Sequence, residues 1–230
     1  MLLKLIERNK SDSVREYVYN MLRENIMYLD LKPGTNITEK DVAEHLEVSR
    51  TPVREALLKL SQEDLLNIYP QKGTIVSLMD IDHIEQAMFI RINLEIAILK
   101  SACIEFPIEV LFELRKNLNS MEFLMDQTVL DTKSLFLHDN EFHKLLYNGT
   151  NKMRAWSVIS QVSSHLNRIR YLKLLTSDVH WDHILDQHRA ITDAIADKDA
   201  NKASEVLNAH FGGFDMEIHK LKEKNRIYFK

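Results

Sequence analysis

Four side chains with metal-ligating chemistry are spaced so that they can meet. Asp139 and His143 lie four residues apart in a helical stretch, so both project from one helix face about one turn apart. His188 and His210 flank a helical hairpin whose turn lies near Lys198. The two arms are about ten and about twelve residues long, and at ~1.5 Å rise per residue the two imidazoles return to nearly the same level. One carboxylate and three imidazoles from three helices could therefore hold one ion.

The chemistry of these ligands indicates which ion to expect. Imidazole favours zinc or nickel over magnesium or calcium, so the predicted cofactor is a divalent metal ion, Zn or Ni. The first alternative is chance, because the chain has ten histidines and an Asp/His pair at this spacing is frequent. Five other histidines are predicted to face solvent: His45, His83, His180, His183 and His219.

Two further alternatives retain the metal site but give the metal another role. An ion with an open coordination position could activate water, which would make the chain a metal-dependent hydrolase. No separate acidic residue is placed by the sequence as a general base near the four ligands, which disfavours hydrolysis. The other alternative is a purely structural metal in a DNA-binding protein that senses nothing.

Charged residues also interrupt the apolar stripe of the helix predicted over residues 82–104. Arg91 and Glu95 lie one turn apart on that stripe, and buried charges need partners. One interpretation is an internal ion pair that fixes a helical bundle. The other places Arg91 at the border of an effector cavity, where its guanidinium pairs with a carboxylate. Arg168 and Arg170 are rival carboxylate-binding residues, and only one of them is expected to point inward.

A second site is indicated in residues 41–60. A short helix is followed by a tight connection and by a second helix, whose apolar residues recur at i, i+3, i+4 and i+7. Ser49 is expected to cap the second helix with its hydroxyl. Arg50 and Arg54 stand one turn apart on its exposed side. These are the parts of a helix-turn-helix that reads the major groove, and the alternative is a helical hairpin whose arginines simply face water.

The next segment strengthens the DNA-binding interpretation. An apolar run is formed by Leu65, Leu66, Ile68 and Tyr69, and residues 74–78 are β-branched and alternating, so the two segments predict a hairpin with Lys72 and Gly73 at its tip. A helix-turn-helix followed by a hairpin is a winged helix, and a basic tip with a glycine can lie close to phosphates. The net charge of −4 supplies no global attraction to DNA. Binding would rest on the local arginine patch, doubled in a dimer.

Everything after about residue 80 has a helical pattern. The predicted helices lie near residues 82–104, 107–126, 131–148, 151–175, 180–197 and 200–225. The predicted fold class is mainly α, with an N-terminal winged helix-turn-helix followed by an antiparallel α-helical bundle. The predicted domains are 1–79, which binds DNA, and 80–230, which binds metal and effector.

Composition is compatible with this organisation. A chain of 230 residues is long enough for two small domains. Hydrophobic residues make up 45% and charged residues 28%, as in a soluble globular protein. No run approaches the ~18 apolar residues needed to cross a bilayer. The single cysteine, Cys103, excludes an intrachain disulfide and agrees with a reducing cytoplasm.

The helix-turn-helix motif resembles a known family. The run VSRTPVREAL from Val48 to Leu57, followed by a wing of pattern PxxG, resembles the GntR family of bacterial transcription regulators, and the similarity spans residues 13–78. One departure falls at Asp64, where the family more often has a glycine at the bend into the wing. The resemblance implies DNA contacts at Lys40, Ser49, Arg50, Thr51, Arg54, Lys72 and Gly73.

Residues 82–222 resemble the FCD domain, the ligand-sensing helical domain of the FadR-like branch of that family. The features that carry the resemblance are Arg91-x-x-x-Glu95, Asp139-x-x-x-His143, the turn at residues 148–151, and His188 with His210. Many members bind a divalent metal through an aspartate and three histidines. The resemblance therefore implies one metal site with the ligands Asp139, His143, His188 and His210.

Together these features predict a cytoplasmic, ligand-responsive bacterial transcription regulator rather than an enzyme. It would bind pseudo-palindromic operator DNA as a homodimer, because a single winged module reaches only a few base pairs. A small organic acid would complete the coordination of the metal. Its binding would shift the relative placement of the two wings and so alter DNA affinity.

Overall fold

The computed structural model describes residues 3–69, 73–176 and 179–230, and packing divides the chain into two compact units. The first unit comprises Met1–Glu85, Gln161–Leu172 and Ile218–Lys230, and the second comprises Gln86–Ser160 and Lys173–Glu217. The predicted domains were divided after residue 79. In the structure, two segments from the later part of the chain pack with the N-terminal residues.

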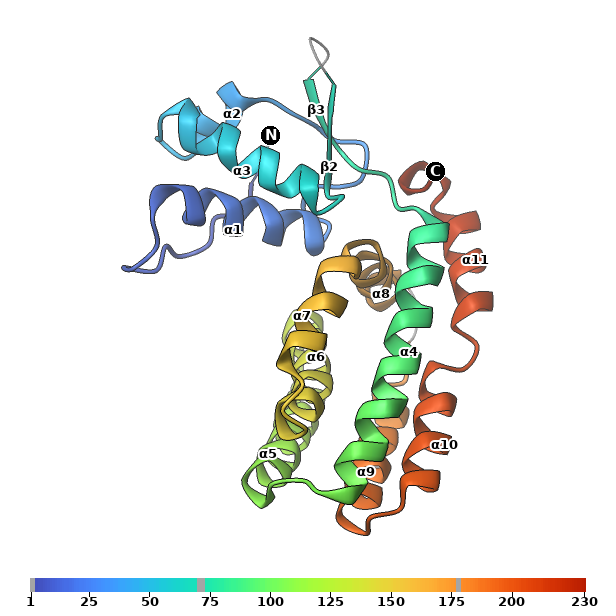
Figure 1. Ribbon diagram of the computed structural model, residues 1–230. Helices are drawn as coiled ribbons and strands as arrows, with labels where there is room; N and C mark the ends of the chain where they lie inside the picture. The colour runs from blue at the N-terminus through green and yellow to red at the C-terminus, as the bar shows by residue number, and fades with distance from the viewer. Residues whose placement is uncertain (1–2, 70–72, 177–178) are drawn as a thin grey trace. The chain divides into compact units, whose positions relative to one another are not determined.

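The N-terminal part of the first unit is a winged helix-turn-helix, which confirms the predicted fold class. Its elements are α1 (Val14–Met27), β1 (Asn36–Ile37), α2 (Glu39–His45), α3 (Arg50–Gln62), β2 (Leu66–Tyr69) and β3 (Gly73–Val76) (Figure 1). Helix α1 packs against α3, and the apolar stripe of α3 lies in their shared core. The strands form an antiparallel sheet of order β1-β3-β2, in which Leu66 lies opposite Val76.

Local capping explains where the helices of this unit begin. Ser13 and Glu16 form a capping box at the start of α1, and Thr38 accepts a hydrogen bond from the backbone N–H of Asp41 at the start of α2. Ser49 occupies the N-cap position of α3, but its side chain makes no capping hydrogen bond. The predicted cap at Ser49 is therefore wrong, and its exposed hydroxyl is not used by the helix.

The bend into the wing depends on a residue in the left-handed region. Asp64 has φ of 58°, a conformation that aspartate tolerates better than most non-glycine residues. This is the position at which the sequence departs from the glycine of the family. The backbone shape that glycine usually provides is thus kept by a residue with a short polar side chain.

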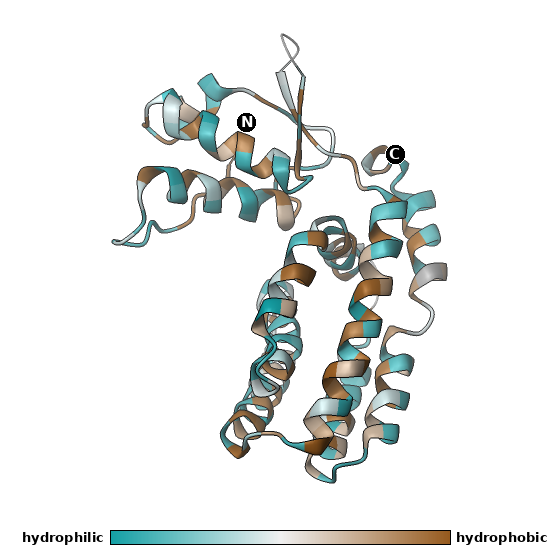
Figure 2. Cartoon of the chain, viewed as in Figure 1, coloured by the Kyte–Doolittle hydropathy of each residue, from teal (hydrophilic) through white to brown (hydrophobic). Residues whose placement is uncertain are grey.

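The second unit is built from helices. The remaining elements of the chain are α4 (Ile81–Ile104), α5 (Ile108–Met125), α6 (Thr132–Gly149), α7 (Met153–Val162), α8 (Ser164–Thr176), α9 (Trp181–Ala196), α10 (Ala200–Phe211), α11 (Phe214–Lys224) and η1 (Arg226–Tyr228). Most of α8 and of α11, and all of η1, belong to the first unit. Helix α5 packs against α6 and α9, and α9 packs against α10. Figure 2 shows hydrophobic residues recurring along α4, as expected for a helix that contributes to the core of the bundle.

Two of the predicted helices are each divided into two. The helix predicted over residues 151–175 breaks at Ser163, whose carbonyl accepts the first hydrogen bond of α8. Serine favours the start of a helix over its interior, so the serine pair at 163 and 164 is the feature of the sequence that indicates this break. The helix predicted over residues 200–225 breaks at Gly212 and Gly213, where Gly213 has φ of 79°.

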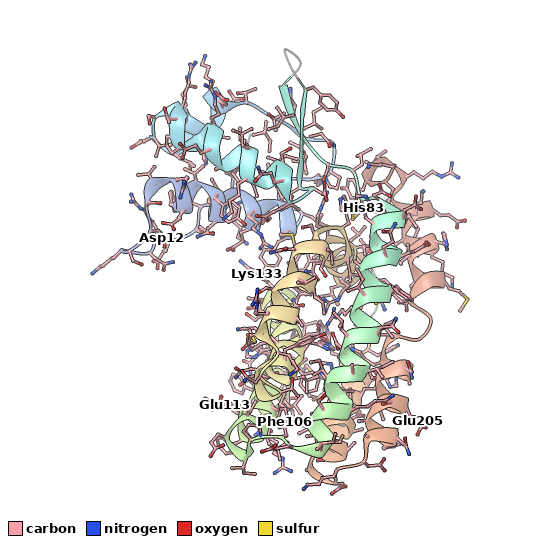
Figure 3. The ribbon with its side chains drawn as sticks, in the orientation of Figure 1. Asp12, His83, Phe106, Glu113, Lys133 and Glu205 are labelled. Carbon is pink, nitrogen blue, oxygen red and sulfur yellow. The ribbon has the colours of Figure 1, made fainter. Side chains whose placement is uncertain are left out.

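A glycine allows close packing at one end of the bundle. A Cβ atom at Gly149, the last residue of α6, would lie only 2.2 Å from Cε2 of Phe106, in the connection between α4 and α5. Phe106 is labelled in Figure 3, which also shows Glu113 and Glu205 on the outer faces of α5 and α10. Among the described helices, none is both long and apolar enough to cross a membrane.

Candidate metal centre and DNA-binding surface

The structure brings the four predicted metal ligands together inside the second unit. Helix α6 supplies Asp139 and His143, α9 supplies His188 and α10 supplies His210. One ligand atom from each side chain can be chosen so that all four lie within 4.8 Å of one another. Three of the residues are buried and His210 is partly buried. The five histidines predicted to face solvent are all exposed: His45, His83, His180, His183 and His219.

The imidazole of His188 has the environment of a metal ligand. Both of its ring nitrogens are buried and have no hydrogen-bond partner among the described residues, and its Nε2 lies 3.7 Å from Oδ1 of Asp139. A buried polar group without a partner is costly, so this ring fits a bound cation better than it fits simple packing. Burial lowers the pKa of His188 to about 3. The ring is therefore neutral at pH 7, as coordination requires.

His210 and His188 are each held by a neighbouring side chain. Nδ1 of His210 lies 2.9 Å from Oε1 of Gln187, and the ring of His188 stacks on Phe142 at 3.9 Å between centroids. Burial also lowers the pKa of His210 to about 3. Gln187 was not predicted to belong to the site, and its only signal in the sequence is that it directly precedes His188.

The charged pair on α4 lies next to the four candidate metal ligands. Nε of Arg91 donates to Oε1 of Glu95 at 2.7 Å, so the predicted internal ion pair is present and buried. The other carboxylate oxygen of Glu95 lies 2.6 Å from Nδ1 of His143 on α6. The sequence identified no separate acidic residue as a general base near the ligands, and it did not predict the contact between Glu95 and His143. Glu95 is engaged by both partners, which leaves it badly placed to act as a general base.

Two other polar groups near the cluster are buried. One terminal guanidinium nitrogen of Arg91 and the hydroxyl of Tyr147 have no hydrogen-bond partner among the described residues. Burial raises the pKa of Tyr147, and the guanidinium of Arg91 lies 5.2 Å from the ring centroid of Phe211. Hydrogen-bond donors that are buried without an acceptor suit an anionic ligand. Tyr147 was not among the predicted site residues.

The two rival arginines on α8 have different partners. Arg168 is fully buried in the first unit and donates to Ser77, through Nη1 to its hydroxyl at 3.0 Å and through Nη2 to its carbonyl at 2.6 Å. Burial lowers the pKa of Arg168 to about 10, so it stays charged at pH 7. Arg170 is half-buried and donates to Asn167. These hydrogen bonds of Arg168 hold the segment that follows β3.

The predicted DNA-binding residues of α2 and α3 lie on exposed positions. Arg54 forms a two-point ion pair with Glu39, from Nε to Oε1 at 2.8 Å and from Nη2 to Oε2 at 2.9 Å. The hydrogen bond from Arg54 lowers the pKa of the Glu39 carboxyl. Arg50 is exposed, and no hydrogen bond or ion pair joins it to another residue in the described ranges. Glu39 was not predicted to take part in this surface.

The remaining predicted contacts divide into two groups. Lys40, Ser49 and Thr51 are exposed on α2, on the turn and on α3. Gly73 begins β3 with φ of 104°, a backbone conformation that favours glycine. Lys72 lies outside the residues that the structure describes.

Family comparisons agree with both parts of the molecule. The bacterial regulatory proteins of the gntR family match residues 14–76, and the FCD domain matches residues 86–213. The first match covers the winged helix-turn-helix, and the second covers all four residues of the candidate metal centre. The chain belongs to the GntR family of bacterial regulators and carries an FCD domain.

Relatives with similar sequences extend over nearly the whole chain. The HTH-type transcriptional repressor RspR of Escherichia coli strain K12 is 27% identical over 227 residues, which cover 96% of each chain. An HTH-type transcriptional regulator in an unstable DNA locus of Streptomyces ambofaciens is 31% identical over 208 residues, which cover 90% of this chain and 86% of that protein.

Solved structures share the fold at lower sequence identity. McbR/YncC of E. coli has a TM-score of 0.75 and 22% identity, over 93% of this chain and 99% of that chain. A GntR transcriptional regulator from Rhodococcus sp. RHA1 has a TM-score of 0.73 and 21% identity, over 91% and 99%. The family and its relatives establish this chain as a transcription regulator and not an enzyme, so the hydrolase alternative is set aside.

Proposed function

We propose that this regulator binds a divalent metal ion and a small organic acid in its helical bundle, and that the acid controls operator binding. The observation that carries the proposal is the convergence of Asp139, His143, His188 and His210 within 4.8 Å. The buried nitrogens of His188 support it further, because they have no hydrogen-bond partner among the described residues. Regulators with FCD domains respond to small molecules, which fits a ligand site in this unit.

The chemistry of the donors supports zinc or nickel as the bound ion. Three imidazoles and one carboxylate suit a transition ion better than magnesium or calcium. Low pKa values keep His188 and His210 neutral over the physiological range. When bound, the ion supplies a Lewis-acidic centre that can accept a carboxylate oxygen as a further ligand.

We propose that the effector carries a carboxylate, because the protein groups beside the candidate metal site are hydrogen-bond donors. Arg91 and Tyr147 each present a buried donor atom that has no acceptor among the described residues. A carboxylate could be a ligand of the metal ion and could also accept hydrogen bonds from Arg91 and Tyr147. This assigns Arg91 two roles, in which it pairs with Glu95 through Nε and offers a terminal nitrogen to the effector.

The winged helix-turn-helix supplies the DNA-binding surface. Arg50 and Arg54 are proposed to contact base edges in the major groove, since arginine can bind a guanine at two points. The wing tip, Lys72 and Gly73, is proposed to lie on the phosphate backbone together with the exposed polar residues Lys40, Ser49 and Thr51. Because operator DNA lies in the bacterial cytoplasm, the protein is proposed to act there. Repression is the proposed effect on transcription, because the relative RspR is named a repressor.

The proposal predicts that metal and acid act together on DNA binding. Operator duplexes can be selected in vitro for binding to this chain, and organic acids can be screened by thermal shift with and without zinc or nickel. An effector should raise the melting temperature only with metal present, and it should then change operator affinity. In samples whose circular dichroism shows a folded bundle, Arg91→Met should abolish the response to the acid. Arg189→Met, which removes an exposed arginine of the same unit, should not.

Two outcomes would contradict this function. One is an operator affinity that no organic acid changes in the metal-loaded protein, which would leave a structural metal. The other is a response to acid that is identical in the metal-free protein.

A homodimer is proposed because one winged module contacts too few base pairs for useful affinity. Two copies would place their recognition helices on half-sites about one helical turn, ~34 Å, apart. Sedimentation at micromolar concentration should give a mass of twice 27.0 kDa. A monomer both with and without operator DNA would contradict this arrangement.

A further inference from the structure

One acidic side chain outside the ligand set is joined directly to a ligand. Oε2 of Glu95 lies 2.6 Å from Nδ1 of His143, and both side chains are fully buried. The residues are 48 positions apart and lie on α4 and α6, so the contact depends on the fold of the bundle. Oε1 of the same carboxylate accepts a hydrogen bond from Nε of Arg91 at 2.7 Å.

These two contacts favour one tautomer of His143. A carboxylate can only accept hydrogen bonds, and one oxygen of Glu95 already accepts a hydrogen bond from the guanidinium of Arg91. The proton of a neutral imidazole must then lie on Nδ1, where it is donated to Glu95. Nε2 keeps its lone pair and is the atom left for coordination.

We propose that Glu95 is a positioning residue of the metal centre, which fixes His143 as the Nδ1–H tautomer with Nε2 as its metal-binding atom. This inference rests on the proposed metal site. It assigns a role in metal affinity to a residue that would not touch the metal. Carboxylate partners of this kind orient ligating histidines and increase their basicity.

Arg91 makes the arrangement specific for a carboxylate at position 95. In a Glu95→Gln variant, the amide has one oxygen, and Nε–H of Arg91 requires an acceptor. If the amide oxygen faces Arg91, the amide nitrogen faces Nδ1 of His143 and donates to it. That contact favours the Nε2–H tautomer, in which the atom needed by the metal carries a proton.

The alternative role of Glu95 is purely structural, as a partner that neutralises Arg91 in the bundle. The two roles differ in what they predict for the glutamine variant. A structural role affects stability and leaves the tautomer of His143 and the metal affinity unchanged. A positioning role changes both of these even when the variant is folded.

The test compares full-length wild type with Glu95→Gln and with Glu85→Gln, which makes the same change at an exposed position of the same helix. Zinc affinity is measured by competition with a chromophoric chelator, and helical content by circular dichroism. Glu95→Gln should bind zinc about 10-fold to 100-fold more weakly. Glu85→Gln should bind it as wild type does.

The tautomer is measured separately, in metal-free protein labelled with ¹⁵N at histidine. Long-range nitrogen–proton correlations identify which ring nitrogen carries the proton, and the His143→Gln variant assigns the signals. Wild type should show His143 protonated at Nδ1, and Glu95→Gln should lose this pattern. Equal zinc affinity in wild type and a folded Glu95→Gln variant, or an unchanged tautomer, would overturn the inference. If wild type itself binds no zinc or nickel, the metal site fails, while the tautomer measurement still tests the contact.

Discussion

Two arginine–glutamate pairs illustrate how differently the two units hold their charges. In the winged helix, Arg54 and Glu39 form a two-point pair whose side chains are 67% and 31% exposed. In the bundle, Arg91 and Glu95 form a pair whose side chains are 3% and 0% exposed. The distances are nearly equal, 2.8 Å and 2.7 Å from Nε to the nearest carboxylate oxygen. The pairs therefore differ in their exposure to solvent and not in their shortest distance.

Solvent decides what each pair can do. Water screens the exposed pair, so Arg54 can leave Glu39 for a better acceptor on DNA at little cost. The buried pair has no such freedom, because either charge alone would be strongly destabilising. The first pair suits a surface that must exchange partners, and the second suits a site that must hold its geometry.

The largest expected effect is the loss of one partner of the buried pair. Arg91→Met leaves the carboxylate of Glu95 buried without its cation, and we expect the free energy of unfolding to fall by about 3–5 kcal/mol. Urea denaturation with a chelator present measures this, so that no metal ion compensates the charge. The double variant Arg91→Met with Glu95→Gln should lose less than Arg91→Met alone, because the uncompensated charge is gone.

A matched control comes from an exposed pair in the same unit. Arg189 lies 2.7 Å from Glu122, and their side chains are 40% and 50% exposed. Arg189→Met should change the free energy of unfolding by about 0–1 kcal/mol. If Arg91→Met were no more harmful than Arg189→Met, burial would not distinguish the pairs and the comparison would be wrong.

An intermediate effect is expected for the exposed arginines in DNA binding. Arg50→Ala and Arg54→Ala should each weaken operator binding by about fivefold to a hundredfold, the range expected for a two-point contact with a guanine. Fluorescence anisotropy with a selected operator measures this. Thermal unfolding should be unchanged, because neither side chain is buried. Arg115→Ala, an exposed arginine of α5, is the control. If both arginine variants bound the operator with wild-type affinity, the assignment of this surface to DNA binding would be wrong.

The smallest effect is expected for the partner of Arg54. Glu39→Gln keeps the shape of the side chain and removes a charge that water already screens. Operator affinity should change by less than about fivefold, and the urea midpoint should stay the same. A loss as large as that of Arg54→Ala would show that Glu39 is itself needed for recognition.

Much of this molecule could be predicted from local patterns. The winged helix follows from apolar periodicity, a tight turn and a β-branched hairpin, all of which are short-range signals. The ligand set could be predicted because Asp139 and His143 share one helix and because His188 and His210 lie on the two arms of one hairpin.

Two kinds of feature could not be predicted from the sequence. They are contacts between residues that are distant in the sequence, and interruptions of a predicted helix. Glu95 and His143 are 48 residues apart, and Glu39 and Arg54 are 15 apart, so no periodicity joins them. In the sequence, Glu95 is recognisable only as a charged residue on an apolar stripe, and this pattern does not identify its partners. Apolar periodicity continues through Ser163, so the pattern alone merged α7 with α8.

The most direct test of the account is a calorimetric titration of metal-free protein with zinc, for wild type and for three variants. Wild type should bind close to one ion per chain. His188→Ala and His210→Ala should bind it at least about tenfold more weakly, because each loses an imidazole from the coordination shell. His219→Ala, which removes an exposed histidine, should match wild type. Equal binding by all four proteins, or no binding of zinc or nickel by wild type, would contradict the metal centre.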